Sequence, residues 1–311
     1  RRFDETATLD RLCASGRIDA ALIDALAAQV ADMHHGAAIV AVSDVAGRMA
    51  RIASETIGEL RDRADLFATD EVSGLAGATD TALMRLAPLM QRRAAAGLVR
   101  RCHGDLHLAN IALIDGRPVI FDALEFDEDL ATIDILYDLA FLMMDLWSRG
   151  ERTHANRLLN RWLVARGMTA DDMDGLALLP LFVSMRAAIR AKVAAARLRH
   201  LAGADLEAAE REARAMFALS GKAIAQSPAG LVAIGGLSGT GKTTLAMAIA
   251  PDLGPIPGAV VIRSDVVRKL LAGVGETERL PPARYTGQAS ADVNAAMAGM
   301  ADHALAAGHG V

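Results

Sequence analysis

Residues 231–244, LVAIGGLSGTGKTT, decide how the C-terminal part of the chain folds. The apolar run 231–234 predicts a short buried strand, and the apolar run 245–250 predicts a helix. Between them lies the pattern G-x-x-x-x-G-K-[ST], from Gly236 to Thr243. A strand, a glycine-rich loop and a helix in this order are the context of a phosphate-binding P-loop, so we expect a nucleotide site here.

The chemistry of this loop follows from its residue types. Glycines let consecutive backbone N–H groups turn toward an anion without a Cβ clash, and the helix N-terminus adds a partial positive charge. Lys242 would reach the β and γ phosphates of ATP, and the Thr243 hydroxyl would bind Mg²⁺. A chance glycine turn is the alternative, but such a match in a chain of this length is roughly a 1% event. The predicted nucleotide-binding residues are Gly236, Leu237, Ser238, Gly239, Thr240, Gly241, Lys242, Thr243 and Thr244.

The composition is that of a folded globular protein. The chain has 311 residues, enough for two domains or three. Hydrophobic residues make up 52% and charged residues 23%, so the chain can bury a core. The net charge is −5 and there is no basic tail, which disfavours nucleic acid as a partner.

The sequence also bears on the compartment. No uncharged apolar run approaches the roughly 18 residues of a membrane-spanning helix. The opening residues, RRFDETATLDRL, lack the apolar core of a signal peptide. Cys13 and Cys102 lie far apart in the sequence, which is typical of free, buried thiols in a reducing cytosol. We therefore expect a cytoplasmic protein with no membrane partner.

Residues 4–97 have the apolar spacing of helices. We expect four of them, the first two capped by aspartates: after Asp4, after Asp19, over 45–66 and over 79–96. Pro88 predicts a kink or a break in the last one. His34 and His35 close the second helix, where histidines are more often helix-end residues than metal ligands.

A short predicted strand, 98–102, leads into the sequence HGDLHLAN at residues 103–110. A hairpin is expected next, because two apolar runs flank the dipeptide Asp-Gly at 115–116. Asp122 comes just after the second arm of this hairpin. Because a tight hairpin returns the chain beside its start, we expect Asp122 to lie near Asn110.

These residues suit phosphoryl transfer to a hydroxyl, which needs a carboxylate near the acceptor and metal ligands near the phosphates. Protein kinases meet both needs with H-R-D-x-x-x-x-N and a later aspartate. Here His103, Asp105 and Asn110 keep the H-x-D-x-x-x-x-N spacing, and Asp122 follows one hairpin later. The alternative is a solvated loop whose Asp and Asn only form turns. Four residue types at matching spacing favour the catalytic interpretation.

HGDLHLAN followed by IFDALEF resembles the catalytic core of the aminoglycoside phosphotransferase family, which has a protein-kinase-like fold. The resemblance implies that Asp105 is the catalytic carboxylate and that Asn110 and Asp122 hold Mg²⁺. It also implies that Asp138 caps and anchors its helix, and it makes Glu125 a further candidate for contact with metal or substrate. The match is dense over residues 101–145.

The resemblance has one departure, which concerns the N-terminal lobe. Kinases of this kind carry a β-lobe with a phosphate-covering loop and a lysine on a strand, whereas residues 4–97 are predicted to be helical. The resemblance therefore implies a chain that begins near the hinge between the lobes, with the kinase activity of this stretch open. At the other end, residues 310–311 come where a strand is expected to begin, so we expect both ends to be cut.

Residues 134–225 are predicted to form a second helical stretch. The expected helices lie near 133–147 and over 151–166, 176–200 and 204–225. A basic cluster on the third is interpreted as a solvated face, with substrate phosphate as the less favoured alternative: Arg186, Arg190, Lys192, Arg197, Arg199 and His200. Proline and glycine at 226–230 mark a boundary, so we predict domains over 1–225 and 226–311.

A second candidate site follows the boundary. Residues 259–262 predict a strand that ends in RSDVVR, which places Asp265 at the ligand edge of a parallel sheet. There Asp265 could accept the proton of an acceptor hydroxyl while Arg268 steadies phosphate; a plain N-cap with Arg268 as its partner is equally compatible with the spacing. The stretch resembles the small P-loop kinases, such as polynucleotide kinase and zeta-toxin-like and gluconate-kinase-like enzymes, and this favours the catalytic interpretation.

Taken in order, the two halves resemble a bacterial two-module family, described as bifunctional phosphotransferases with an ATP-binding, AAA-family part. The expected fold is a helix-rich α/β chain: a protein-kinase-like C-lobe followed by a partial P-loop domain with a parallel sheet. The resemblance implies an enzyme that uses ATP and Mg²⁺ to phosphorylate a hydroxyl of a small molecule, with Asp105, Asp265, Lys242 and Arg268 in catalysis. A nucleotide-dependent switch or scaffold, or an AAA-type motor, stays open, as do the acceptor and the oligomeric state.

Overall fold

The computed structural model describes residues 5–124, 128–225, 227–237 and 239–311. We refer to residues 5–225 as the N-terminal region and to residues 227–311 as the C-terminal region. The helices of the N-terminal region are α1 (Leu9–Ala14), α2 (Ala20–Gly36), α3 (Val45–Arg61), α4 (Thr69–Ala95), α5 (Glu128–Ala131), α6 (Ile135–Ser148), α7 (Arg152–Ala165), α8 (Ala170–Gly175), α9 (Leu179–Arg197) and α10 (Gly203–Ile224). None of the helices in the described ranges is long and apolar enough to cross a membrane.

Local capping explains where the early helices begin. The Asp19 carboxylate accepts from the backbone N–H of Leu22 at the start of α2, and Asp44 does the same for Gly47 in α3, both at 2.8 Å. Asp4, the expected cap of the first helix, lies outside the described residues. The expected start of the fourth helix is wrong: α4 begins at Thr69, about three turns of helix before residue 79, with acidic residues in its first turn, and Pro88 lies inside it without ending it.

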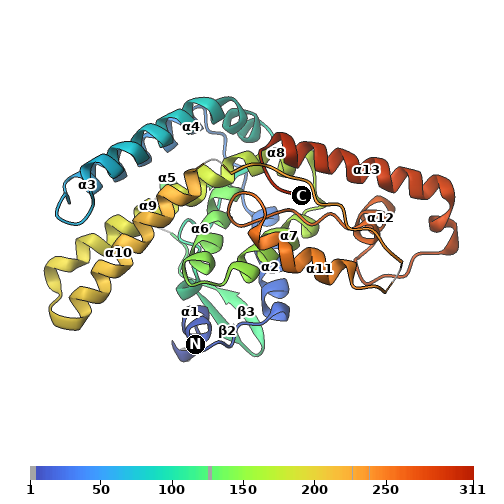
Figure 1. Cartoon of the computed structure of the whole chain (residues 1–311), viewed down its shortest axis with the longest axis horizontal. Helices are drawn as coiled ribbons and strands as arrows, with labels where there is room; N and C mark the ends of the chain where they lie inside the picture. The colour runs from blue at the N-terminus through green and yellow to red at the C-terminus, as the bar shows by residue number, and fades with distance from the viewer. Residues whose placement is uncertain (1–4, 125–127, 226, 238) are drawn as a thin grey trace.

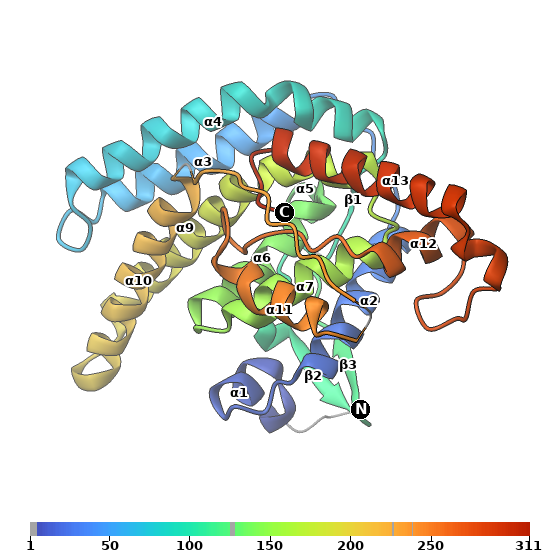
Figure 2. The same ribbon diagram turned by 45° about the vertical axis from the view of Figure 1, so that its right-hand side comes forward.

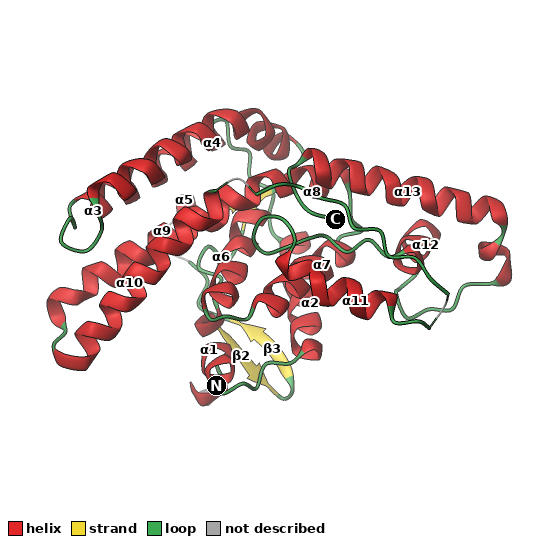
Figure 3. Ribbon diagram, in the orientation of Figure 1, coloured by secondary structure: helices red, strands yellow, loops and turns green. Residues whose placement is uncertain are grey.

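Two small antiparallel sheets flank the loop at residues 103–110 (Figure 3). Their strands are β1 (Val99–Arg101) paired with β4 (Thr132–Asp134), and β2 (Ile111–Ile114) paired with β3 (Arg117–Ile120). The β2–β3 hairpin turns at Asp115 and Gly116, whose φ angles are 50° and 74°. Positive φ at both turn residues is the geometry that Asp-Gly favours, so the predicted hairpin is confirmed.

Helix α6 is the centre of the N-terminal region. Its side chains from Ile135 to Leu146 are all buried, and it packs against α7 and α9. Asp134 caps it by accepting from the N–H of Leu136 at 2.8 Å. The Arg93 guanidinium, from α4, donates to the same carboxylate at 2.7 and 2.9 Å. Helix α6 is mostly apolar and is buried on all sides, as expected for a helix in the interior of a protein. The loop at 103–110 packs on this helix.

The C-terminal region contains α11 (Lys242–Ile249), α12 (Ser264–Ala272) and α13 (Gly287–Ala306). The strands expected at 231–234 and 259–262 are not regular strands: the described part of this region has only extended segments there. The Val311 N–H donates to the Gly230 carbonyl and the Val232 N–H to the Val311 carbonyl, both at 2.9 Å. On the other side, the Val260 N–H donates to the Gly310 carbonyl at 2.8 Å. The ladder has the parallel pattern, but it is too short to form a regular sheet.

The two regions lie side by side. Figures 1 and 2 show α11, α12 and α13 grouped on one side, with the pairs α3–α4 and α9–α10 extending on the other. Helix α7 packs along α2 and also contacts α11, while α13 packs on α8. Helix α7 therefore belongs to the core of the N-terminal region and also to the boundary with the C-terminal region.

Candidate functional site

The loop at residues 103–110 is tied to the chain that follows the hairpin. The ring Nε2 of His103 lies 2.8 Å from the Phe121 carbonyl, and the His103 carbonyl accepts from the N–H of Leu124 at 3.0 Å. The Phe121 N–H donates to the Asn110 carbonyl, also at 3.0 Å. Asp122 directly follows Phe121, so the hairpin places it close to Asn110, as its position in the sequence predicts.

Asp105 is the half-buried carboxylate of this loop, with 40% of its side chain exposed. Its Oδ2 lies 3.3 Å from Nε2 of His107 and accepts from Nδ2 of Asn110 at 3.1 Å. The hydrogen bond with His107 is the main cause that lowers the pKa of the Asp105 carboxyl, against the opposing effect of partial burial. Asp105 is therefore ionised at neutral pH and can accept a proton or a hydrogen bond from a hydroxyl.

Asp122 is exposed and has a φ of 62°, in the left-handed region. Aspartate tolerates this region better than most residues, and such conformations gather at functional sites. Asn110 and Asp122 offer oxygen ligands, the type that Mg²⁺ prefers, so the donor set fits a magnesium ion. Glu125, the further candidate, lies outside the described residues.

Two carboxylates of α6 accept hydrogen bonds from backbone N–H groups of the loop. Asp138 is fully buried and accepts from the N–H groups of His103, at 3.2 Å, and Gly104, at 2.9 Å. The expectation that Asp138 caps its own helix is wrong, because Asp134 is the cap. Asp145 accepts from the N–H of Leu108 at 2.9 Å, and no motif in the sequence marks it as a residue of this site.

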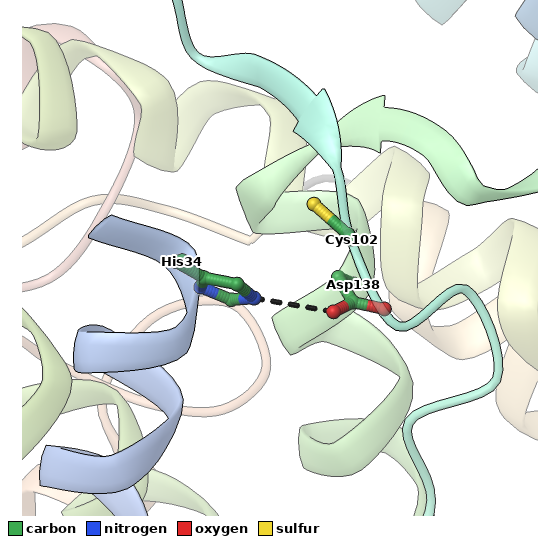
Figure 4. A group of neighbouring side chains, drawn as sticks. All are labelled: His34, Cys102 and Asp138. Atoms are coloured by element: carbon green, nitrogen blue, oxygen red, sulfur yellow. Dashed lines mark hydrogen bonds and ion pairs between the residues drawn. The ribbon is translucent and has the colours of Figure 1, made fainter. Parts of the chain in front are cut away.

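Asp138 also belongs to a buried trio with His34 and Cys102, whose ligand-type atoms lie within 4.8 Å of one another (Figure 4). Nδ1 of His34 accepts from the Trp162 indole N–H at 3.1 Å, so the ring proton is on Nε2, which lies 3.2 Å from Asp138. Burial raises the pKa of the Cys102 thiol well above its usual value. Protons and hydrogen bonds thus occupy these atoms, and we interpret the trio as a support for the loop.

Arg186, from α9, corrects one sequence expectation. The basic cluster was expected on a solvated face, but Arg186 is buried, with its guanidinium 3.9 Å from the ring centre of Tyr137 and 4.8 Å from that of Phe141. These rings explain how a charge is accommodated there. Its positive charge also helps to lower the pKa of the Asp105 carboxyl, after the larger effect of His107.

The predicted P-loop has the backbone conformation that its glycines allow. Gly236, Gly239 and Gly241 have φ angles of 150°, 79° and 84°, a region that favours glycine. Gly241 precedes the first turn of α11, and a Cβ on Gly236 would lie 3.1 Å from Oγ1 of Thr240. Ser238 lies outside the described residues. The positive-φ glycines and the helix start fit a bound phosphate.

Lys242 curls back over this loop. Its Nζ donates to the carbonyls of Gly236 and Leu237 at 2.7 and 2.5 Å, and Thr240 Oγ1 donates to the Leu237 carbonyl at 2.8 Å. The ammonium group thus lies at the mouth of the loop, where it can exchange carbonyl oxygens for phosphate oxygens. Both kinds of partner are oxygen acceptors for its three N–H donors.

Asp265 shares a cavity of about 1010 Å³ with the predicted P-loop. The polar part of its lining is Gly236, Gly239, Thr240, Gly241, Lys242, Thr243, Thr244, Arg263, Ser264 and Asp265. Asp265 is in the first turn of α12 without capping it, and it pairs with Lys269 at 3.2 Å. Arg268 lies apart from the cavity lining: it donates to the Arg284 carbonyl at 2.6 Å and lies over the Tyr285 ring.

Comparison with known proteins identifies the N-terminal region. Residues 5–179, more than half of the chain, match the model of the phosphotransferase enzyme family. The chain belongs to this family. The resemblance stated from HGDLHLAN and IFDALEF is therefore confirmed, and residues 231–311 match the model of an AAA domain.

The curated relatives that match this chain are described as uncharacterized proteins. Proteins of two Mycobacterium tuberculosis strains and of Mycobacterium bovis are 30% identical to it over 279 residues, which is 88% of the chain and 54% of each relative. The chain thus spans about half the length of the curated relatives it matches. Among solved structures, an ethanolamine kinase of Plasmodium vivax aligns with a TM-score of 0.41 at 10% identity, covering 70% of this chain and 63% of that one.

Proposed function

We propose that this protein is an ATP-dependent phosphotransferase that moves the γ-phosphate of ATP to a hydroxyl of a small molecule, with two phosphoryl-transfer sites on one chain. The observation that carries the proposal is that each region groups a carboxylate with phosphate or metal ligands. Asp105 contacts Asn110 through its side chain, and Asp265 lines one cavity with Lys242. Such groupings provide positioning and electrostatic stabilisation, which dominate catalysis of phosphoryl transfer.

At the first site, Asp105 would orient the acceptor hydroxyl and take its proton. Its contacts with His107 and Asn110 favour the ionised carboxylate and hold it against the loop. Asn110 and Asp122 would hold Mg²⁺, which supplies charge neutralisation to the phosphates when it is bound.

At the second site, the loop N–H groups and Lys242 would bind the phosphates, and the Thr243 hydroxyl would bind Mg²⁺. Asp265, which lines the same cavity, would take the proton of a second acceptor. Arg268 is assigned to phosphate on resemblance only. For that role its side chain would have to leave Tyr285 and the Arg284 carbonyl.

A nucleotide-dependent switch or scaffold is the second candidate. What favours it is that the described residues ahead of the loop at 103–110 form helices α1–α4 and not a β-lobe that covers the phosphates; a β-lobe encoded upstream in the full-length gene would favour the enzyme instead. In that case the C-terminal region would bind nucleotide, while the N-terminal region would bind a protein partner without transferring phosphate.

Labelled phosphate distinguishes these functions. The chain and its full-length form are incubated with γ-labelled ATP and a cell metabolite extract, beside the variants Asp105→Asn and Asp265→Asn. We expect each variant to lose the label on one acceptor by about 100-fold or more, because removal of a general base costs that much. Equal labelling by the parent and both variants would contradict the catalytic assignment. Nucleotide binding without any labelled acceptor would favour the switch.

A further inference from the structure

Two buried asparagines of α7 reach from the N-terminal region into the C-terminal region. Asn156 and Asn160 are 3% and 6% exposed, and their side-chain amides donate to the Ala259 carbonyl at 2.9 and 3.1 Å. Oδ1 of Asn160 accepts in turn from the N–H of Val261 at 2.6 Å. One side-chain amide of α7 therefore binds both a carbonyl and an N–H of the segment 259–261.

This pairing imitates a neighbouring strand. In a parallel ladder, the N–H of one residue donates to the carbonyl of residue i on the neighbouring strand, and its carbonyl accepts from the N–H of residue i+2. Val311 makes these two bonds to Gly230 and Val232. Asn160 makes the same two bonds to Ala259 and Val261. The Val260 N–H points the opposite way, to Gly310. The segment is thus bonded on both edges, to backbone on one side and to α7 on the other. The N–H of Val261, which would otherwise be an unpaired edge donor, is paired with Asn160.

A second contact from α7 fixes the next residues. Arg161 donates to the Glu276 carboxylate at 2.5 Å, and Arg263 donates to the same carboxylate. All three side chains are about one quarter exposed, at 26%. Burial raises the pKa of the Glu276 carboxyl, and the two arginines more than reverse this, so it is lowered. Charge pairing in this half-buried site keeps Arg263 in place, two residues before Asp265.

We propose that Asn160 is a positioning residue for Asp265: it serves as a surrogate strand that sets where the segment 259–263 ends and hence where Asp265 faces the predicted P-loop. The inference rests on the proposed function of the second site. It means that this site is completed by a helix of the N-terminal region, outside the part of the chain that matches the AAA domain. Asn160 touches no phosphate and acts only through the segment.

The test compares Asn160→Leu with two neighbours, all in an Asp105→Asn background so that only the second site turns over. Asn156→Leu removes one bond to Ala259 and the side-chain acceptor that Asn156 offers to the Asn160 amide, but it leaves the bond between Asn160 and Val261. Asp174→Asn breaks the His303 pair between α8 and α13 and does not touch the segment. The measurements are Val261 amide exchange by NMR, and kcat and KM for turnover of Mg²⁺·ATP, read as released plus transferred phosphate.

We expect Asn160→Leu to speed Val261 exchange by about tenfold or more, because its N–H loses the only acceptor recorded for it in the described residues. The kcat should fall by on the order of tenfold to 100-fold, as for a displaced catalytic group. The KM for ATP should stay within about twofold, because the phosphate loop lies across the ladder from Asn160. Asn156→Leu should have a smaller effect, and Asp174→Asn none on exchange.

Two results would overturn the proposal. One is unchanged Val261 exchange in Asn160→Leu. The other is faster exchange with kcat unchanged, or with kcat and KM altered in proportion, which a merely structural role would give. Absence of turnover in the parent background would instead count against the proposed function. The exchange comparison needs no activity, and it would still decide whether Asn160 holds the segment.

Discussion

The candidate catalytic loop at residues 103–110 lies on buried polar side chains from distant parts of the chain, whereas the predicted P-loop is held by bonds within itself. Asp138, Asp145 and His34 support the first, and α6 beneath it is buried along most of its length. Lys242 bonds to Gly236 and Leu237 of its own loop, and α11 has no buried residue. The first site is thus part of the core, whereas the second is a local motif that contacts α7 of the N-terminal region through Asn160 and through the packing of α7 on α11.

The largest effect on stability should come from Asp138→Ala. It leaves the N–H groups of His103 and Gly104 and the ring of His34 without their acceptor in the interior. Removal of one partner from such a buried group costs about 3 to 5 kcal/mol of unfolding free energy. Urea unfolding measures this. Asp138→Asn, which keeps one oxygen acceptor, should lose clearly less. A loss below about 1 kcal/mol for the alanine variant would mean that the loop does not depend on this carboxylate.

An intermediate effect should come from acid, through His309. This residue is fully buried beside Gly310 and Val311, and burial lowers the pKa of its ring to about 4 from a usual value near 6.5. The unfolded chain binds the proton first as the pH falls. The contribution of the neutral His309 ring to stability is therefore complete above pH 6.5 and is lost progressively as the pH falls from 6.5 through about 4.

Between pH 7 and pH 4.5 this loss amounts to about 2 kcal/mol. Urea unfolding of the parent and of His309→Leu at both pH values isolates it, because other groups titrate alike in both proteins. The leucine variant should show a smaller acid loss by that amount. His35→Leu, at an exposed site, is the control and should match the parent. An identical acid loss in the His309→Leu variant would refute the assignment.

The smallest effect on stability should come from Lys242→Ala. Its bonds are exposed and local, so the unfolding free energy should change by about 0.5 kcal/mol or less. The same urea experiment gives this value. A loss comparable to that of Asp138→Ala would mean that the predicted P-loop is part of the core and would remove the contrast between the two sites.

The same contrast separates what the sequence could predict from what it could not. The β2–β3 hairpin, the cap at Asp19 and the glycines of the predicted P-loop depend on neighbours in the chain, so local patterns sufficed. The N–H groups from which Asp138 accepts and the burial of Arg186 depend on which segments pack together, which no local pattern states.

Asn160 is the clearest case of a residue that sequence reasoning missed. It lies on an ordinary amphipathic helix, and its partners Ala259 and Val261 are about a hundred residues further along the chain. The apolar runs 231–234 and 259–262 predict regular strands, but the short ladder gives these extended segments few backbone partners. A side-chain amide from α7 supplies the missing edge bonds.

A titration of Mg²⁺·ATP tests the central claim most directly, with calorimetry on the parent, Lys242→Ala and Asp122→Ala. The account predicts that Lys242→Ala loses the affinity of the C-terminal region by about 100-fold or more, since a desolvated, hydrogen-bonded charge pair with phosphate is lost. Asp122→Ala should keep that affinity, because Asp122 belongs to the other site. Unchanged binding by Lys242→Ala would contradict the account.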